Sequence, residues 1–108
     1  MKKNIMKEYR NDKGQYHRTD GPAVIYPNGS KEWWIDNKLH RIDGPAVIYP
    51  NGDMVWYKNG VLHRKDGPAI KYVNGYKGWY VEGKYYTKQK FNDYKLKLKL
   101  IPSKMWII

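Results

Sequence analysis

Apolar and polar residues alternate along the middle of this chain in a pattern typical of β-strands. In the stretch Ala-Val-Ile-Tyr at 23–26, alternation places the valine and the tyrosine on one face and the alanine and isoleucine on the other. The pair Asn-Gly at 28–29 favours a tight turn, because both residues tolerate positive φ. The stretch Lys-Glu-Trp-Trp-Ile at 31–35 then supplies a return strand, so the pattern predicts a β-hairpin.

This hairpin pattern recurs with a period of 23 residues. The segment from His17 to Gly29 returns nearly unchanged at 40–52, and a third copy begins at His63. Each return strand ends in a second tight turn. The positions that repeat in register are Arg18, Arg41 and Arg64; Asp20, Asp43 and Asp66; Gly21, Gly44 and Gly67; Pro22, Pro45 and Pro68; Tyr26, Tyr49 and Tyr72; Trp33, Trp56 and Trp79. Consecutive hairpins therefore join into an antiparallel meander, with no room for a helix inside the repeats.

We accordingly predict a mainly β fold, a single twisted antiparallel β-meander of about three and a half 23-residue hairpin repeats with a short C-terminal cap. The expected parts are a basic N-terminal tail at 1–8, the repeats at 9–86 (a partial repeat at 9–16, then 17–39, 40–62 and 63–85) and a basic cap at 87–108. The sequence allows two secondary structures for the cap, a helix or a strand. Thr87 can N-cap a helix with Phe91, Tyr94, Leu98 and Ile101 at helical spacing, whereas Lys-Leu-Lys-Leu-Lys-Leu at 95–100 alternates as a strand.

The third copy indicates which face of the sheet is better buried. The isoleucine column of the first two copies becomes Lys71, whereas the valine column stays apolar as Ile70. We therefore expect the face that carries the valine column and Tyr26 to be the better-buried one.

Two aromatic columns run along the return strands and point to opposite faces. One consists of Trp33, Trp56 and Trp79, and the other of Trp34, Tyr57 and Tyr80. Aromatic residues at such spacing usually serve cross-strand packing. A thin sheet cannot cover both of its faces, however, and an open aromatic strip is a surface for a partner or a second copy. Either column can be the open one, and we select Trp34, Tyr57 and Tyr80 as the candidate binding column.

Length and composition narrow the function classes. At 108 residues the chain is one small domain, and its lack of cysteine excludes disulfides, thiol nucleophiles and cysteine-ligated zinc. It shows no signal-peptide core and no apolar run that could span a bilayer, so we expect a soluble, cytoplasmic protein.

The net charge of +11 is concentrated at the ends of the chain. Residues 14–83 carry nine basic and seven acidic residues, whereas residues 84–108 carry seven and one. The C-terminal lysines either keep the chain soluble or form a patch for an anionic partner beside the aromatic strip. This candidate patch comprises Lys84, Lys88, Lys90, Lys95, Lys97 and Lys99.

The repeated His-Arg-x-Asp motif suggests acid–base or metal chemistry, but its spacing argues against one shared site. Equivalent residues of successive hairpins lie two strands apart, or ~10 Å, whereas zinc–ligand bonds are ~2 Å. A polar connector explains the motif more simply, with the aspartate accepting hydrogen bonds from arginine or backbone and Gly-Pro setting the turn. The only serines are Ser30 and Ser103, and no phosphate-binding loop is present. We therefore predict no catalytic residue, no metal and no cofactor.

The repeat resembles the MORN repeat and its variants over residues 9–86. Tyr-Pro-Asn-Gly at 26–29 and 49–52 is similar to the Tyr-Pro-Asp-Gly of that family, and the connector Leu-His-Arg-x-Asp-Gly-Pro-Ala resembles divergent copies in bacteriophage and giant-virus proteins. The resemblance implies an open, twisted β-meander that acts as an interaction scaffold without catalysis. Some members bind proteins or dimerise, and others are proposed to contact phospholipid.

We expect a non-enzymatic interaction module, an accessory protein of phage or viral type that binds or occludes a host protein or protein–nucleic acid assembly. Its contacts are expected from the aromatic column and the basic cap, because an open sheet offers area and no deep pocket. Weakly sequence-specific nucleic-acid or anionic-ligand binding, anionic membrane binding and homodimerisation remain open as alternatives.

Overall fold

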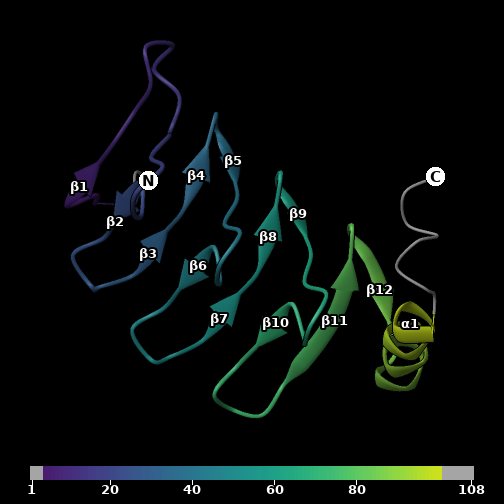
Figure 1. Cartoon of the computed structure of the whole chain (residues 1–108). Helices are drawn as coiled ribbons and strands as arrows, with labels where there is room; N and C mark the ends of the chain where they lie inside the picture. The colour runs from purple at the N-terminus through teal and green to yellow at the C-terminus, as the bar shows by residue number, and fades with distance from the viewer. Residues whose placement is uncertain (1–3, 101–108) are drawn as a thin grey trace.

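The computed structural model describes residues 4–100. Short strands lie side by side along the chain, and one helix stands at the C-terminal end (Figure 1). The strands are β1 (Lys7–Glu8), β2 (Val24–Ile25), β3 (Lys31–Glu32), β4 (Trp34–Ile35), β5 (Lys38–Leu39), β6 (Val47–Ile48), β7 (Met54–Val55), β8 (Tyr57–Lys58), β9 (Val61–Leu62), β10 (Ile70–Lys71), β11 (Lys77–Val81) and β12 (Lys84–Tyr86), and the helix is α1 (Lys88–Leu100). The predicted mainly β class is confirmed.

Eight of the strands form one antiparallel sheet in the order β1-β2-β3-β6-β7-β10-β11-β12. Each repeat contributes a hairpin that closes at its Asn-Gly turn. In the first turn the N–H of Gly29 donates to the carbonyl of Tyr26 at 2.9 Å, and Gly29 has a φ of 93°. Neighbouring hairpins pair through β3 with β6 and through β7 with β10, so the predicted meander is confirmed.

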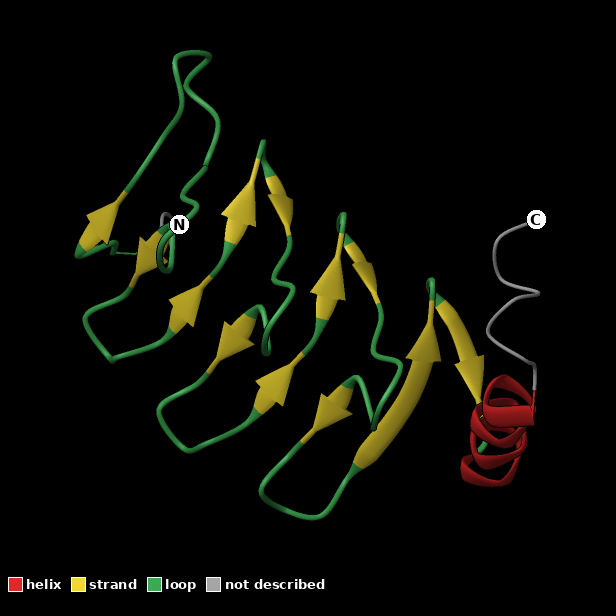
Figure 2. Cartoon of the chain, in the orientation of Figure 1, coloured by secondary structure: helices red, strands yellow, loops and turns green. Residues whose placement is uncertain are grey.

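The return strands of the first two full repeats are divided at their first tryptophan, a detail that the sequence pattern did not predict. The N–H of Trp33 donates to Ala46 of the next repeat at 2.7 Å, and its carbonyl accepts from the N–H of His40 at 3.0 Å. Beyond Trp33, β4 leaves the main sheet and pairs with β5, and β8 pairs with β9 in the same way (Figure 2). No further repeat follows β11, where Trp79 pairs with Tyr86 instead, and that strand stays continuous.

The core is a thin layer of small side chains along both sides of the main sheet. Its buried apolar residues are Ala23, Val24, Ala46, Val47, Val55, Ala69, Val81 and Phe91. Burial of the valine column agrees with the prediction. On the opposite face the isoleucine column is half-buried and its third member, Lys71, is exposed, so the valine column is the better buried of these two columns, although the alanines beside the isoleucines are fully buried.

The C-terminal cap is a helix, which decides between the two structures that the sequence left open. Its N-cap is Thr87, whose Oγ1 accepts a hydrogen bond from the N–H of Lys90 at 3.2 Å. The Phe91 ring, only 2% exposed, packs against Trp79 with ring centroids 6.5 Å apart, and Tyr94 contacts Tyr86 at 5.6 Å. Ile101 lies outside the described residues.

Among residues 4–100, no helix has the length and apolar character needed to cross a bilayer.

Candidate binding surfaces

The connector between repeats is built around an arginine that stacks on a tryptophan. The Arg41 guanidinium carbon lies 3.9 Å from the centroid of the Trp33 ring, Nε donates to Asp43 at 3.2 Å, and Nη1 donates to the carbonyl of Pro45 at 3.0 Å. The same arrangement recurs for Arg64 on Trp56, and Arg18 stacks on Tyr9 of the partial repeat. The Asp and Pro of the motif therefore serve to hold the arginine on the aromatic ring.

The glycine of the motif makes room for this guanidinium. A Cβ atom on Gly44 would lie 2.9 Å from Cζ of Arg41, closer than van der Waals contact allows. Gly21 and Gly67 stand against Arg18 and Arg64 in the same way. The motif therefore has glycine after aspartate because the arginine guanidinium lies too close to this position for a side chain.

The histidines of the motif stabilise the second turn of each repeat. Nδ1 of His17, His40 and His63 accepts a hydrogen bond from the backbone N–H of Asp36, Asn59 and Glu82 at 3.1, 3.0 and 2.8 Å. These three turn residues have positive φ of 46°, 49° and 50°. Side chains other than glycine rarely adopt this conformation, and a local hydrogen bond helps to hold it. The contact assigns a structural task to each repeated histidine.

The carboxylates near the histidines do not complete a metal site. Nδ1 of His63 also lies 3.3 Å from Oε1 of Glu82, but a nitrogen that accepts a hydrogen bond carries no proton, so this contact is no ion pair. The arrangement of His, Asp and Glu side chains within residues 4–100 offers no group of three that could hold a metal ion.

We predict that acidification destabilises the protein through His63, whose side chain is 10% exposed. Burial, the largest cause, lowers the pKa of His63 from 6.5 in the folded protein. The unfolded chain then binds the proton more readily, so the stabilisation is present above about pH 6.5 and is lost as the pH falls through and below it. Urea denaturation of the wild type at about pH 7 and about pH 5 measures this loss.

The control is His63→Asn, because the Asn side-chain oxygen accepts the same hydrogen bond without titrating. The midpoint of this variant should depend less on pH than that of the wild type. An unchanged pH dependence would show that His63 is not responsible.

A continuous aromatic surface covers the sheet face opposite the stacked arginines; we call it the aromatic face. Side-chain alternation, strand register and ring contacts place nine rings on it: Tyr16, Tyr26, Trp34, Tyr49, Tyr57, Tyr72, Tyr76, Tyr80 and Tyr85. Ring centroids of Tyr16 and Trp34 are 5.4 Å apart, and those of Tyr80 and Tyr85 are 5.5 Å apart. The candidate column Trp34, Tyr57 and Tyr80 therefore belongs to a larger surface.

The carboxylate of Glu32 links two of these rings, those of Tyr26 and Trp34, by hydrogen bonds. Oε1 of Glu32 accepts from the Tyr26 hydroxyl at 3.1 Å and from Nε1 of Trp34 at 3.1 Å. Burial first, and then the Glu32 charge, raises the pKa of Tyr26 to about 12. Burial likewise raises the pKa of Tyr49 and Tyr57. These phenols remain neutral near physiological pH and present hydroxyl groups, and the carboxylates of Glu8 and Glu32 supply the charge on this face.

The candidate column from the sequence comprises three half-buried members of this face and none of its exposed ones. Trp34, Tyr57 and Tyr80 are half-buried, whereas Tyr49, Tyr76 and Tyr85 are 44%, 50% and 56% exposed. Tyr76 contacts Tyr72 at 5.6 Å, and Tyr49 and Tyr72 border a hollow of about 530 Å³. Side-chain alternation along the first strand of each hairpin places Tyr26, Tyr49 and Tyr72 on this face, so the sequence did contain a signal for Tyr49.

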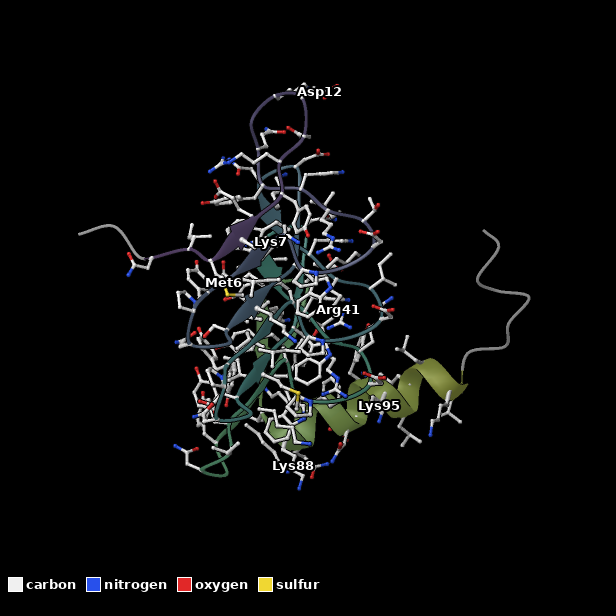
Figure 3. All side chains as sticks on the ribbon, turned by 90° about the vertical axis from the view of Figure 1, so that its left-hand side faces the viewer. Met6, Lys7, Asp12, Arg41, Lys88 and Lys95 are labelled. Atoms are coloured by element: carbon white, nitrogen blue, oxygen red, sulfur yellow. The ribbon has the colours of Figure 1, made fainter. Side chains whose placement is uncertain are left out.

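The basic cap does not adjoin this aromatic face. Helix α1 packs on Trp79 and Tyr86, which point away from Tyr80 and Tyr85. Lys84 also lies on the far side, 5.4 Å from the centroid of the Tyr86 ring. In Figure 3 the connector with Arg41 and the Lys95 end of α1 project from the same side of the strands. The two predicted binding sets therefore occupy opposite faces.

The cap lysines are also divided among themselves. Helical spacing places Lys90 and Lys97 on one flank of α1 and Lys88, Lys95 and Lys99 on the other. Leu96 and Leu100 lie exposed between the two flanks. The cap thus presents two short basic strips separated by an apolar one.

Two open grooves separate successive connectors, with volumes of about 770 and 760 Å³. Most of their polar lining consists of the Arg–Asp pairs and histidines already described, and the rest includes Thr19, Lys58 and Lys65. Because the arginines, aspartates and histidines are hydrogen-bonded to one another or to backbone, they are not free to bind a small molecule in the grooves.

Searches of protein-family models, curated proteins and solved structures found no match to this chain.

Proposed function

We propose that this chain is a non-enzymatic binding module of MORN-like type, whose aromatic face docks onto a protein. The supporting observation is the array of tyrosine rings along one face of the sheet, described above. Tyrosine gives large, rigid contact area at low cost in side-chain entropy, and its hydroxyl adapts to polar partners. Such residues are enriched in protein interfaces and among their hot spots.

The shape of the chain supports a macromolecular partner. Its Cα atoms extend over 47 × 36 × 21 Å, so the array is broad and thin. A stable interface buries about 800 Å² on each partner, which a broad open face can provide. The resemblance of the repeats to phage and viral sequences favours a host protein, or a protein–nucleic acid assembly, that is occluded when the module binds.

The test uses the three most exposed tyrosines, since their replacement should leave the fold intact. Tyr49→Ser, Tyr76→Ser and Tyr85→Ser are combined in one variant. A partner obtained by affinity purification with the wild-type protein is purified, and its Kd is measured by calorimetry. We expect the triple variant to bind at least about tenfold more weakly, because exposed interface aromatics commonly contribute more than 1 kcal/mol.

The matched control removes exposed apolar side chains elsewhere, with Ile42→Ser in a connector and Leu96→Ser on the cap. This control should bind like the wild type. If the control loses affinity while the aromatic variant retains it, the aromatic face is not the docking surface.

A further inference from the structure

The main sheet carries opposite charges on its two faces. Seven strands align one row of residues on the connector side, namely Lys7, Ile25, Lys31, Ile48, Met54, Lys71 and Lys77. The row directly behind it, on the aromatic face, is Glu8, Val24, Glu32, Val47, Val55, Ile70 and Gly78. The first row has four cations and no acid, and the second has two acids and no cation.

We propose that the four cations, which we call the lysine row (Lys7, Lys31, Lys71 and Lys77), bind the phosphate backbone of a nucleic acid. All four side chains are exposed, and none has an acidic partner among residues 4–100. The connector arginines, in contrast, are each paired with an aspartate. The lysine row is therefore available to an external anion.

One pair in the row is arranged unfavourably in the absence of an anion. Lys71 and Lys77 are direct cross-strand partners in β10 and β11. Like charges in this position repel each other and destabilise a sheet. A bound phosphate between the two ammonium groups would relieve that repulsion.

The dimensions of the row suit a linear polyanion. Its seven strands span six intervals of about 4.8 Å, or roughly 29 Å. A DNA duplex carries one charge per about 1.7 Å of its axis, so every lysine of the row can meet a phosphate. The residues between the lysines are Ile25, Ile48 and Met54, which offer no ring for base stacking. Binding through the row should therefore not depend on base sequence.

A planar membrane fits this site less well than a nucleic acid does. Helix α1 packs on Trp79 and Tyr86, on the same face as the row, and it projects away from the strands (Figure 3). A flat bilayer would meet this helix before it reached all four lysines. A nucleic-acid backbone is narrow and can lie along the row beside the helix.

The test measures the salt dependence of binding to a mixed-sequence DNA duplex of about 20 base pairs, which is longer than the row. Four phosphate contacts predict a slope of log K against log salt of about −3.6, or a loss of roughly 150-fold between about 50 and 200 mM salt. Changing Lys31→Gln, Lys71→Gln and Lys77→Gln together should reduce the slope to about −0.9, or a loss of roughly 3-fold over the same range.

The matched control removes the same number of charges from the cap by Lys88→Gln, Lys90→Gln and Lys97→Gln. This cap variant should retain the wild-type slope, and so should the aromatic-face variant, because its tyrosines lie on the other side of the sheet. Equal loss in the row and cap variants would overturn the proposal, since binding would then follow net charge alone. Binding of anionic lipid vesicles without binding of the duplex would also overturn it. Neither result bears on the aromatic face, whose test uses a different partner.

Discussion

Replacement of Phe91 by alanine is expected to lower the free energy of unfolding by about 3–5 kcal/mol, the usual cost of deleting a buried aromatic ring. Of the two aromatic side chains in α1, Phe91 is fully buried and Tyr94 is half-buried. The Phe91 ring covers Trp79 of the last repeat. In the two earlier repeats an arginine, Arg41 or Arg64, stacks on the equivalent tryptophan. The next position in that arginine column is Thr87, so no arginine covers Trp79. Without Phe91 the last repeat has no cover on that side, and terminal repeats need such a cap.

Chemical denaturation followed by tryptophan fluorescence measures the effect, and circular dichroism reports the loss of the helix. Leu96→Ala is the matched control, because Leu96 lies on the same helix but points to solvent. Its substitution should change stability by less than about 0.5 kcal/mol. Equal effects of the two substitutions would mean that α1 does not cap the sheet through Phe91.

Gly44→Ala is expected to destabilise the protein by about 2 kcal/mol, although the added methyl group is small. The new Cβ would lie 2.9 Å from Cζ of Arg41 and displace its guanidinium from Trp33. Displacement removes a cation–π contact of about 0.5–2 kcal/mol and a hydrogen bond of about 1 kcal/mol to Pro45. The exposed pair with Asp43 adds little.

A double-mutant cycle separates this mechanism from a general effect on the backbone. If the cost of Gly44→Ala arises from displacing Arg41, the substitution should cost almost nothing more in an Arg41→Ala background. Thermal denaturation of the wild type, both single variants and the double variant measures the coupling. Additive losses would show that the glycine is required for another reason.

The repeated His-Arg-x-Asp motif shows which contacts residue types and spacing can predict and which they cannot. The spacing of His17, His40 and His63 argues against a shared metal site, and it predicts a connector in which aspartate meets arginine, as the structure shows. The stack of each arginine on a ring and the hydrogen bond from each turn to a histidine were not predicted. These contacts join residues that are 8 to 19 positions apart in the chain, and the alternation of neighbouring residues does not predict contacts over such separations.

The cap illustrates a second limit. Alternating Lys and Leu at 95–100 fits a strand as well as a helix, because local propensity hardly separates the two. The tertiary contacts of Phe91 with Trp79 and of Tyr94 with Tyr86 require helical spacing and decide the matter. The same packing places the cap lysines on the face opposite the aromatic column.

By itself, the sequence determined the repeat length, the hairpin within each repeat and the mainly β meander, because alternation and Asn-Gly turns act over a few neighbouring residues. Only the tertiary structure decided which side chains share a surface. Strand register assembles Lys7, Lys31, Lys71 and Lys77 into a single row and collects the tyrosines on the opposite face. Register arises from hydrogen bonds between strands that are distant in the chain, so these surfaces exist only after the hairpins have paired.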